Sequence, residues 1–217
     1  MTGPHVLFGQ MLEFNFLPSR TLHASRYDTY ALPGLMPPMP AIPSCQAAWH
    51  RHWSKSILRM LNVGVLEHAR YPELVFGLMS PSTLTTLARR VGVLLCGTAI
   101  RHEIRGEQVR AWQSVLGDEL LTFARRDAVR LDAAAIPGVV TTRIPDTLHE
   151  LESSGYATLL ASLSQSTPAV LRRVELKLPV AVQNGESPLP VEQAWQLCLT
   201  VLKDMDPAWC LSFPAAR

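Results

Sequence analysis

Two glycines and a threonine in the segment RVGVLLCGTAIRHEIR, residues 90–105, have nearly the spacing of a phosphate-binding loop. Gly92 and Gly97 are separated by four residues, and Thr98 follows. In the loop pattern G-x-x-x-x-G-K-[ST], the lysine reaches the β- and γ-phosphates and the next hydroxyl holds magnesium. Here Thr98 stands at the lysine position and Ala99 at the hydroxyl position. The segment therefore lacks the two side chains that nucleotide binding needs.

A helix that begins at Pro81 explains the same segment better. Ser80 can cap the exposed amides, and proline suits the first helical position. One predicted face carries apolar or small residues at helical spacing: Leu84, Leu87, Ala88, Val91, Leu94, Leu95, Thr98 and Ala99. The opposite side carries Val93, Ile100 and Ile104. We expect such a helix to be covered on two sides, with Gly92 and Gly97 allowing close approach of neighbouring helices. The residues expected to reach solvent along its remaining edges are Arg89, Arg90, Arg101 and Arg105.

Other residues with catalytic or metal-binding chemistry do not form a recognisable motif. His50 and His52 are two residues apart, so on a helix they point in nearly opposite directions and cannot share a metal ion. The sequence contains neither G-x-S-x-G nor H-E-x-x-H, and none of its cysteines stands in a C-x-x-C pair. The cysteines are Cys45, Cys96, Cys198 and Cys210. We therefore predict a protein that is not an enzyme and has no structural zinc site. A general base assembled in space stays an alternative, because catalytic groups need not be close in sequence.

The composition is that of a globular protein with few charges. Of 217 residues, 47% are hydrophobic and 18% are charged, and the net charge is +2. This length predicts a single domain over residues 1–217, and the mild charge does not by itself indicate nucleic-acid binding. A signal peptide begins with positively charged residues, but the first 16 residues here contain no Lys or Arg. The longest apolar run, residues 91–100, is too short to cross a bilayer. We expect a soluble, cytosolic chain that does not insert into a membrane.

The hydrophobic pattern predicts a mainly α fold with a short N-terminal strand and a proline-rich arm. Residues 11–17, MLEFNFL, alternate weakly and are predicted as the strand. Five prolines within residues 28–46 exclude a helix or an inner strand there. We predict that this arm or linker packs on its own domain, with contact to another chain as the alternative. A helix is expected over residues 45–68, with Trp49 and Trp53 docking on the core.

Further helices are predicted towards the C-terminus. One covers residues 107–116 and ends at Gly117 in a left-handed cap, and the next follows to Leu131. The remaining predicted helices cover residues 146–164 and 191–203. Between them, the stretch LRRVELKLP, residues 171–179, fits both a strand and a helix, and its period does not decide.

The segment LARRVGVLLCGTAIRHEI, residues 87–104, together with the helices through Leu131, resembles the central block of the SctK/YscK family. The family's Gly-x-Ala-Ile-Arg turn is matched by residues 97–101. Two further blocks resemble the family's opening and late segments: LEFNFLPSRTLH, residues 12–23, and AVLRRVELKLPVA, residues 169–181. The matching blocks occur in the family's order and cover about half of the chain.

This resemblance implies a cytosolic accessory protein of a bacterial type III secretion system. Such proteins act in the sorting platform, at the cytoplasmic face of the inner membrane. There they link the cytoplasmic domain of the inner-membrane ring protein (SctD type) to the pod protein (SctQ type). The implied fold is mainly helical, and no cofactor is implied.

Six arginines within consecutive predicted helices are the candidate protein-binding residues. They are Arg101, Arg105, Arg110, Arg125, Arg126 and Arg130. One interpretation is a solvated face that keeps a charge-poor protein soluble. The other is that some of them meet an acidic surface of the ring or pod protein, because the planar guanidinium pairs bidentately with carboxylates. A helical nucleic-acid-binding module is the runner-up for the same residues, and a nucleotide-binding enzyme is the third hypothesis.

Overall fold

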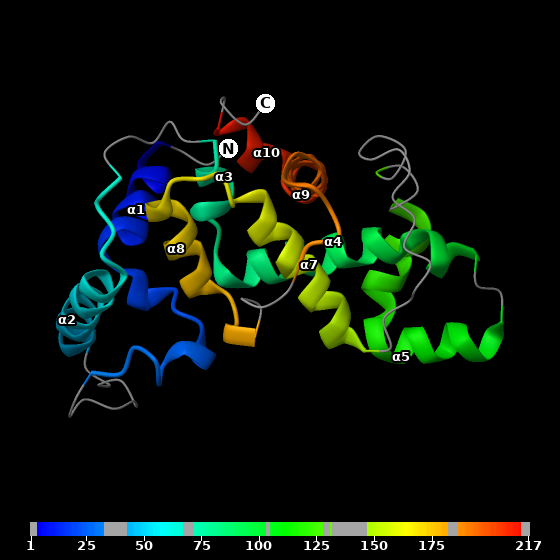
Figure 1. Ribbon diagram of the computed structural model, residues 1–217, viewed down its shortest axis with the longest axis horizontal. Helices are drawn as coiled ribbons and strands as arrows, with labels where there is room; N and C mark the ends of the chain where they lie inside the picture. The colour runs from blue at the N-terminus through cyan, green and yellow to red at the C-terminus, as the bar shows by residue number, and fades with distance from the viewer. Residues whose placement is uncertain are drawn as a thin grey trace. The chain divides into compact units, whose positions relative to one another are not determined.

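The computed structural model is helical throughout the part of the chain that it describes (Figure 1). The described residues are 4–32, 43–66, 72–102, 105–127, 131, 147–181 and 186–213. Within these ranges every regular element is a helix, which confirms the mainly α prediction. The chain forms two compact units: unit 1 comprises residues 1–81, 166–180 and 208–217, and unit 2 comprises residues 82–165 and 181–207. The single adaptor domain over residues 1–217 stays a prediction.

Unit 1 is built from helices near the N-terminus, one helix near residue 170 and a short helix near the C-terminus. Its longer helices are α1 (Pro4–Phe16), α2 (Pro43–Leu61) and α8 (Pro168–Lys177). Its short elements are η1 (Pro18–Arg20), η2 (Ala24–Arg26), α3 (Leu74–Gly77) and α10 (Pro207–Leu211), the last lying in unit 1 except for its first residue. Because α8 arrives from far along the chain, unit 1 depends on contacts between distant segments.

The predicted N-terminal strand is wrong, because residues 11–16 lie in helix α1. The backbone N–H of Leu17 donates to the carbonyl of Glu13 at 2.8 Å, as the last turn of a helix requires. In this helix Phe14 is buried, whereas Leu12 and Phe16 are about half exposed. The alternation over six residues therefore reflects two sides of a short helix, which period alone does not separate from a strand.

The proline-rich arm predicted over residues 28–46 falls mostly on residues outside the described ranges, which exclude 33–42. The described residues at the two ends of this predicted arm do not form an extended arm. Residues 43–46 are the first turn of α2, which begins at Pro43, and Leu32 is buried in the core of unit 1. The helix predicted over residues 45–68 ends at Leu61, where Asn62 adopts a left-handed conformation with φ 50°. Asparagine tolerates this conformation, which is common just after a helix.

The core of unit 1 includes a cluster around Trp53. The cluster consists of Leu22, Leu32, Trp53, Ile57 and Leu176, with Tyr27, Tyr30, Trp49 and Leu61 packed against it. The indole N–H of Trp53 donates to the carbonyl of Tyr30 at 2.7 Å, so its polar group is satisfied inside the core. This confirms the prediction that Trp49 and Trp53 dock on the core.

Unit 2 contains the longer central helices. They are α4 (Pro81–His102), α5 (Gly106–Thr122), the π-helical turn η3 (Phe123–Asp127), α7 (Leu148–Ser162) and α9 (Val191–Met205). Helix α4 begins at Pro81 as predicted and continues through the two glycines, so the segment is not a loop. Residues 91–96 are buried without interruption, and Leu87 and Ile100 are also buried, which confirms burial on two sides of α4.

Helices α4 and α7 touch backbone to backbone at two glycines. A Cβ atom on Gly155 would overlap the main-chain carbonyl of Ala88, and one on Gly92 would overlap the carbonyl oxygen of Leu151. Gly92 therefore has the packing role that the sequence predicts. The corresponding role of Gly97 lies outside the described residues.

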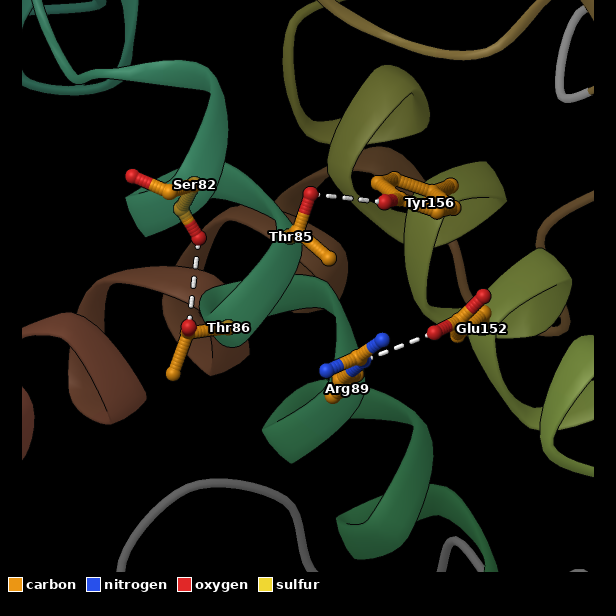
Figure 2. A network of polar contacts seen from close by, with 6 residues as sticks. All are labelled: Ser82, Thr85, Thr86, Arg89, Glu152 and Tyr156. Carbon is orange, nitrogen blue, oxygen red and sulfur yellow. Dashed lines mark hydrogen bonds and ion pairs between the residues drawn. The ribbon is translucent and has the colours of Figure 1, made fainter.

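Polar side chains flank this crossing of α4 and α7 (Figure 2). The guanidinium of Arg89 donates to Glu152 at 2.7 Å, and the hydroxyl of Tyr156 donates to Thr85 at 2.9 Å. Burial raises the pKa of Tyr156, so the phenol stays neutral and keeps its donor hydrogen. The Arg89–Glu152 and Tyr156–Thr85 contacts are one turn apart on both helices. Together they stabilise the register in which the glycines meet the opposite backbone.

The ambiguous stretch at residues 171–179 is helical through Lys177, where α8 ends. Leu178 is extended and its neighbour Pro179 cannot continue a helix. Helix α9 runs two residues beyond the predicted end, to Met205, and its residues Ala194, Cys198 and Val201 are buried. Burial raises the pKa of the Cys198 thiol to about 12, consistent with a packing residue rather than a nucleophile.

Candidate protein-binding surface

Two of the candidate arginines, Arg105 and Arg110, lie at the start of α5. Arg105 precedes the helix in an extended conformation, and its carbonyl accepts the first helical bond, from Val109, at 3.0 Å. Arg110 follows in the second turn and is exposed, whereas Trp112 on the other side of the helix is buried. The sequence therefore folds with its aromatic residue inward and both arginines towards solvent.

Gly117 interrupts α5 with a left-handed conformation, φ 73° and ψ 169°. The predicted break between two helices is thus confirmed in its position and in its positive φ, whereas ψ is extended and differs from the predicted left-handed cap. Across the break, the amide of Gln113 donates to the carboxylate of Asp118 at 2.7 Å. This bond fixes the direction in which the chain resumes towards Thr122.

The next arginines lie on the π-helical turn η3. Phe123 and Ala124 are buried on one side of this turn, and Arg125 and Arg126 are exposed on the other. Single π-helical turns are rare and frequently occur at functional sites. The turn changes the direction of the side chains relative to a regular α-helix, and here it presents two neighbouring arginines.

Arg90 of α4 holds η3 in place. Its guanidinium lies over the ring of Phe123, 5.0 Å from the centroid, and reaches Glu119 at 3.5 Å. It also approaches the carboxylate of Asp204 on α9 at 3.9 Å. Arg89 and Arg90 were expected to reach solvent. The side chain of Arg89 is 41% exposed, as expected, whereas that of Arg90 is mostly covered, and both form ion pairs within unit 2. They position the surface rather than form it.

The structure places four of the six predicted arginines, at two locations. Arg125 and Arg126 are adjacent on η3, and Arg105 and Arg110 lie before the Gly117 break. The side chains of Arg101 and Arg130 lie outside the described residues. Exposed carboxylates of α5 accompany the described arginines, namely Glu107, Asp118 and Glu119. The described surface is therefore mixed in sign, with the densest positive charge on η3.

Two buried cations of α8 in unit 1 were missed by the sequence analysis. Arg173 is 1% exposed and donates to three carbonyls, of Ala169 at 2.9 Å, Gly64 at 3.0 Å and Asn15 at 3.5 Å. It therefore joins the end of α1 to the loop after α2. Burial lowers the pKa of its guanidinium.

Lys177 lies one turn further along α8 and makes the same kind of contact. Its ammonium donates to the carbonyls of Gly77 at 2.6 Å and Met79 at 2.8 Å, and lies 5.1 Å from the ring centroid of Phe14. Burial lowers the pKa of Lys177 to about 7, and the carboxylate of Glu13 acts in the opposite direction. Four residues at i, i+3, i+4 and i+7 form this buried face, namely Val170, Arg173, Val174 and Lys177. That spacing was the available signal, but cations are rarely assigned to a core face.

A serine and a histidine of unit 1 lie as close as a nucleophile and its base. The hydroxyl of Ser19 is 2.8 Å from Nδ1 of His50 and 2.8 Å from the hydroxyl of Ser54. Ser19 is 3% exposed, however, and its hydroxyl also donates to the carbonyl of His50 at 3.1 Å. Burial, followed by the charge of Arg20, lowers the pKa of His50. The arrangement joins η1 to α2 and offers no access for a substrate.

Among the described residues, no three side chains of His, Cys, Asp and Glu lie close enough together to hold a metal ion. No described helix combines the length and the apolar character that crossing a bilayer requires.

Comparison with protein families gives one match, which covers nearly the whole chain. The family model described as "YOP proteins translocation protein K (YscK)" matches residues 10–213. The matched range contains α2 through α10 and most of α1. No curated protein and no solved structure matches the chain.

Proposed function

Because the chain belongs to the YscK family of type III secretion proteins, we propose that it is a non-enzymatic adaptor of the secretion apparatus. In this role it links the cytoplasmic domain of the inner-membrane ring protein (SctD type) to the pod protein of the sorting platform (SctQ type). It acts in the cytoplasm, at the inner face of the membrane when assembled. The family match over residues 10–213 is the observation that carries this proposal.

The arginines of α4, α5 and η3 are proposed as the contact with one of these partners. Arg125 and Arg126 are exposed side by side, and the buried Phe123 and Ala124 anchor the turn that carries them. A guanidinium pairs bidentately with a carboxylate and is weakly hydrated, so an acidic partner surface fits this pair. Arg101, Arg105, Arg110 and Arg130 complete the proposed set.

The test is a triple charge reversal with a matched control. The test variant carries Arg125→Glu, Arg126→Glu and Arg130→Glu. The control carries Arg51→Glu, Lys55→Glu and Arg59→Glu, which make the same change in net charge at exposed positions of α2. We expect both variants to keep the helical circular dichroism of the wild type. Only the test variant should lose retention by the ring-protein domain or the pod protein.

Low salt should increase the difference between the two variants, because exposed charges mainly accelerate association and are screened by ions. Equal retention of both folded variants by both partners would remove the arginines from the interface. If neither partner binds the wild type, even after cross-linking in the native bacterium, the adaptor function itself is wrong.

The nucleic-acid-binding alternative rests on the same exposed arginines and is tested with the same variants. A nucleic-acid-binding module would lose affinity steeply with salt. The test variant should then bind nucleic acid more weakly than the control and with a shallower salt dependence, because fewer phosphates are neutralised. Calorimetry with ATP and magnesium tests the third hypothesis, since clear heat of binding would support a nucleotide site.

A further inference from the structure

Helix α1 of unit 1 has an outward face made almost wholly of apolar side chains. Val6 is 51% exposed, Phe8 65%, Leu12 43% and Phe16 48%. The opposite side of the helix carries the buried Phe14. A helix on a protein surface usually presents polar residues to water, so the outward face of α1 has the character of a second packing face.

A glycine lies at the centre of this face. At about 100° per residue, Val6, Leu12 and Phe16 all fall within about 60° of Gly9 around the helix axis, and so does the partly buried Glu13, the polar member of this face. A Cβ atom on Gly9 would have nothing within 4 Å. Another helix can therefore approach the backbone of α1 closely at Gly9, with Leu12 and Phe8 on one side of it and Val6 on the other.

The face extends beyond α1 at its C-terminal end. The side chain of Asn15 bonds Leu66 twice, donating to its carbonyl at 3.1 Å and accepting from its N–H at 2.9 Å. This pair ties the segment that carries the 54% exposed Val65 to the C-terminal end of α1. The outward face therefore comprises four exposed apolar side chains of α1 around one glycine, with a fifth on the tied segment.

The size and charge of the face restrict what can cover it. Its four side chains on α1 expose on the order of 400 Å², a size at which exposed apolar patches are often functional. A stable homodimer buries about 800 Å² on each partner, roughly twice this area. Helices that lie on lipid carry many Lys and Arg residues, whereas the sequence of α1 contains neither. One apolar helix laid along α1 fits both the area and the absence of cationic residues.

We propose that the outward face of α1 binds an amphipathic helix of a partner protein, with a small residue of that helix seated on Gly9. Apolar residues of the partner, spaced i, i+3 or i+4, and i+7, pack between Phe8, Leu12 and Phe16. This surface lies in unit 1 and does not involve the arginines of unit 2. It gives an adaptor a second contact of different chemistry, apolar where the first is charged.

The experiment uses a photo-reactive phenylalanine analogue at position 8 of the full chain, in the native bacterium with its secretion system. We expect a cross-link to one partner protein, at a segment with the apolar spacing of an amphipathic helix. Gly9→Leu in the same chain should reduce the cross-link yield about tenfold, because the new side chain holds the partner helix away. The matched control is Gly106→Leu, since a Cβ there also meets nothing within 4 Å, and its yield should equal that of the wild type.

Several outcomes would overturn the proposal. A cross-link to a second copy of this chain, to lipid or to another segment of the same chain assigns the face a different occupant. An unchanged yield with Gly9→Leu excludes close approach of a helix. The same probe at position 126 separates this proposal from the adaptor function. If it captures a ring or pod component while position 8 captures no partner, only the α1 proposal fails. If position 8 captures a helix while neither position captures ring or pod components, only the adaptor function fails.

Discussion

In unit 2, helices α4 and α7 approach each other where side chains are absent, whereas in unit 1 helix α8 is tied to its neighbours by long cationic side chains. At Gly92 and Gly155 the backbones touch directly. At Arg173 and Lys177 the guanidinium and ammonium groups donate to carbonyls at the ends of helices and in loops. Both kinds of contact place backbone groups in the core of a unit. The glycine contacts do so by close packing, and the cationic side chains do so by hydrogen bonds.

The glycine contacts and the buried cations differ in which substitutions they tolerate. A glycine contact leaves no room for an added atom, because the overlapping atoms are backbone and cannot rotate away. A buried cation is costly to remove from water, and its removal leaves carbonyls without donors. Unit 2 should therefore be sensitive to added volume, and unit 1 to lost charge and lost hydrogen bonds. Three predictions follow from this difference, in order of expected effect.

The largest expected effect is that of Gly155→Leu in unit 2. The new side chain overlaps the main chain of Ala88, so α7 must move away from α4 and lose the packing of Gly92 as well. We expect a loss of more than about 4 kcal/mol in the free energy of unfolding, measured by urea unfolding followed by circular dichroism. The control is Gly9→Leu, the same substitution where nothing lies within 4 Å. It should be neutral or stabilising, because leucine favours a helix by nearly 1 kcal/mol over glycine. Equal losses in the two variants would contradict the close approach of α4 and α7.

Arg173→Ala should have the next largest effect, in unit 1. It removes the donors for the carbonyls of Gly64 and Asn15 and leaves a cavity beside Phe14, so we expect a loss of about 3 kcal/mol. Arg172→Ala is the control one residue away, because its exposed side chain pairs only with Glu175 within α8 and should cost no more than about 0.5 kcal/mol. If the two variants unfold at the same urea concentration, the cationic contacts do not stabilise unit 1.

The sequence predicts those elements whose pattern and capping residues agree. The start of α4 at Pro81, the break at Gly117 and the helix over residues 191–203 were all predicted, since each depends on local chemistry. The strand predicted at residues 11–17 was wrong, because seven residues are too few to separate the period of a strand from that of a helix. The helical state of residues 171–177 is decided by contacts with α1, α3 and the loop after α2, which are distant in sequence.

The candidate surface could be predicted in part. The exposure of Arg105, Arg110, Arg125 and Arg126 follows from the apolar positions between them. The π-helical turn that directs two of these arginines has no local sequence signal that we recognise, and its Phe123 packs under Arg90, which is distant in sequence. The exposed face of α1 was hidden for a different reason. Leu12 and Phe16 look like core residues, and only the structure shows which side of the helix is covered.

The smallest expected effect is a pH dependence of unit 1 that unit 2 should lack. The pKa of Lys177 is about 7 in the folded chain, lowered by burial from 10.5. Between these two values the unfolded chain binds the proton more tightly than the folded chain does. The free energy of unfolding must therefore rise with pH across this window, by about 2 kcal/mol from pH 7 to pH 9. Below about pH 7 the amine is protonated in both states, and this dependence levels off.

Lys177→Met isolates this contribution, because methionine has a similar shape but no charge. Urea unfolding at pH 7, 8 and 9 should show a rise for the wild type that is absent from the variant, so that the difference between the two curves is the contribution of Lys177. Parallel curves would mean that the two carbonyls and the ring of Phe14 stabilise the ammonium enough to offset its burial. In that case the buried cations of unit 1 would be charged at every pH where the protein is folded, and the contrast with unit 2 would rest on hydrogen bonds alone.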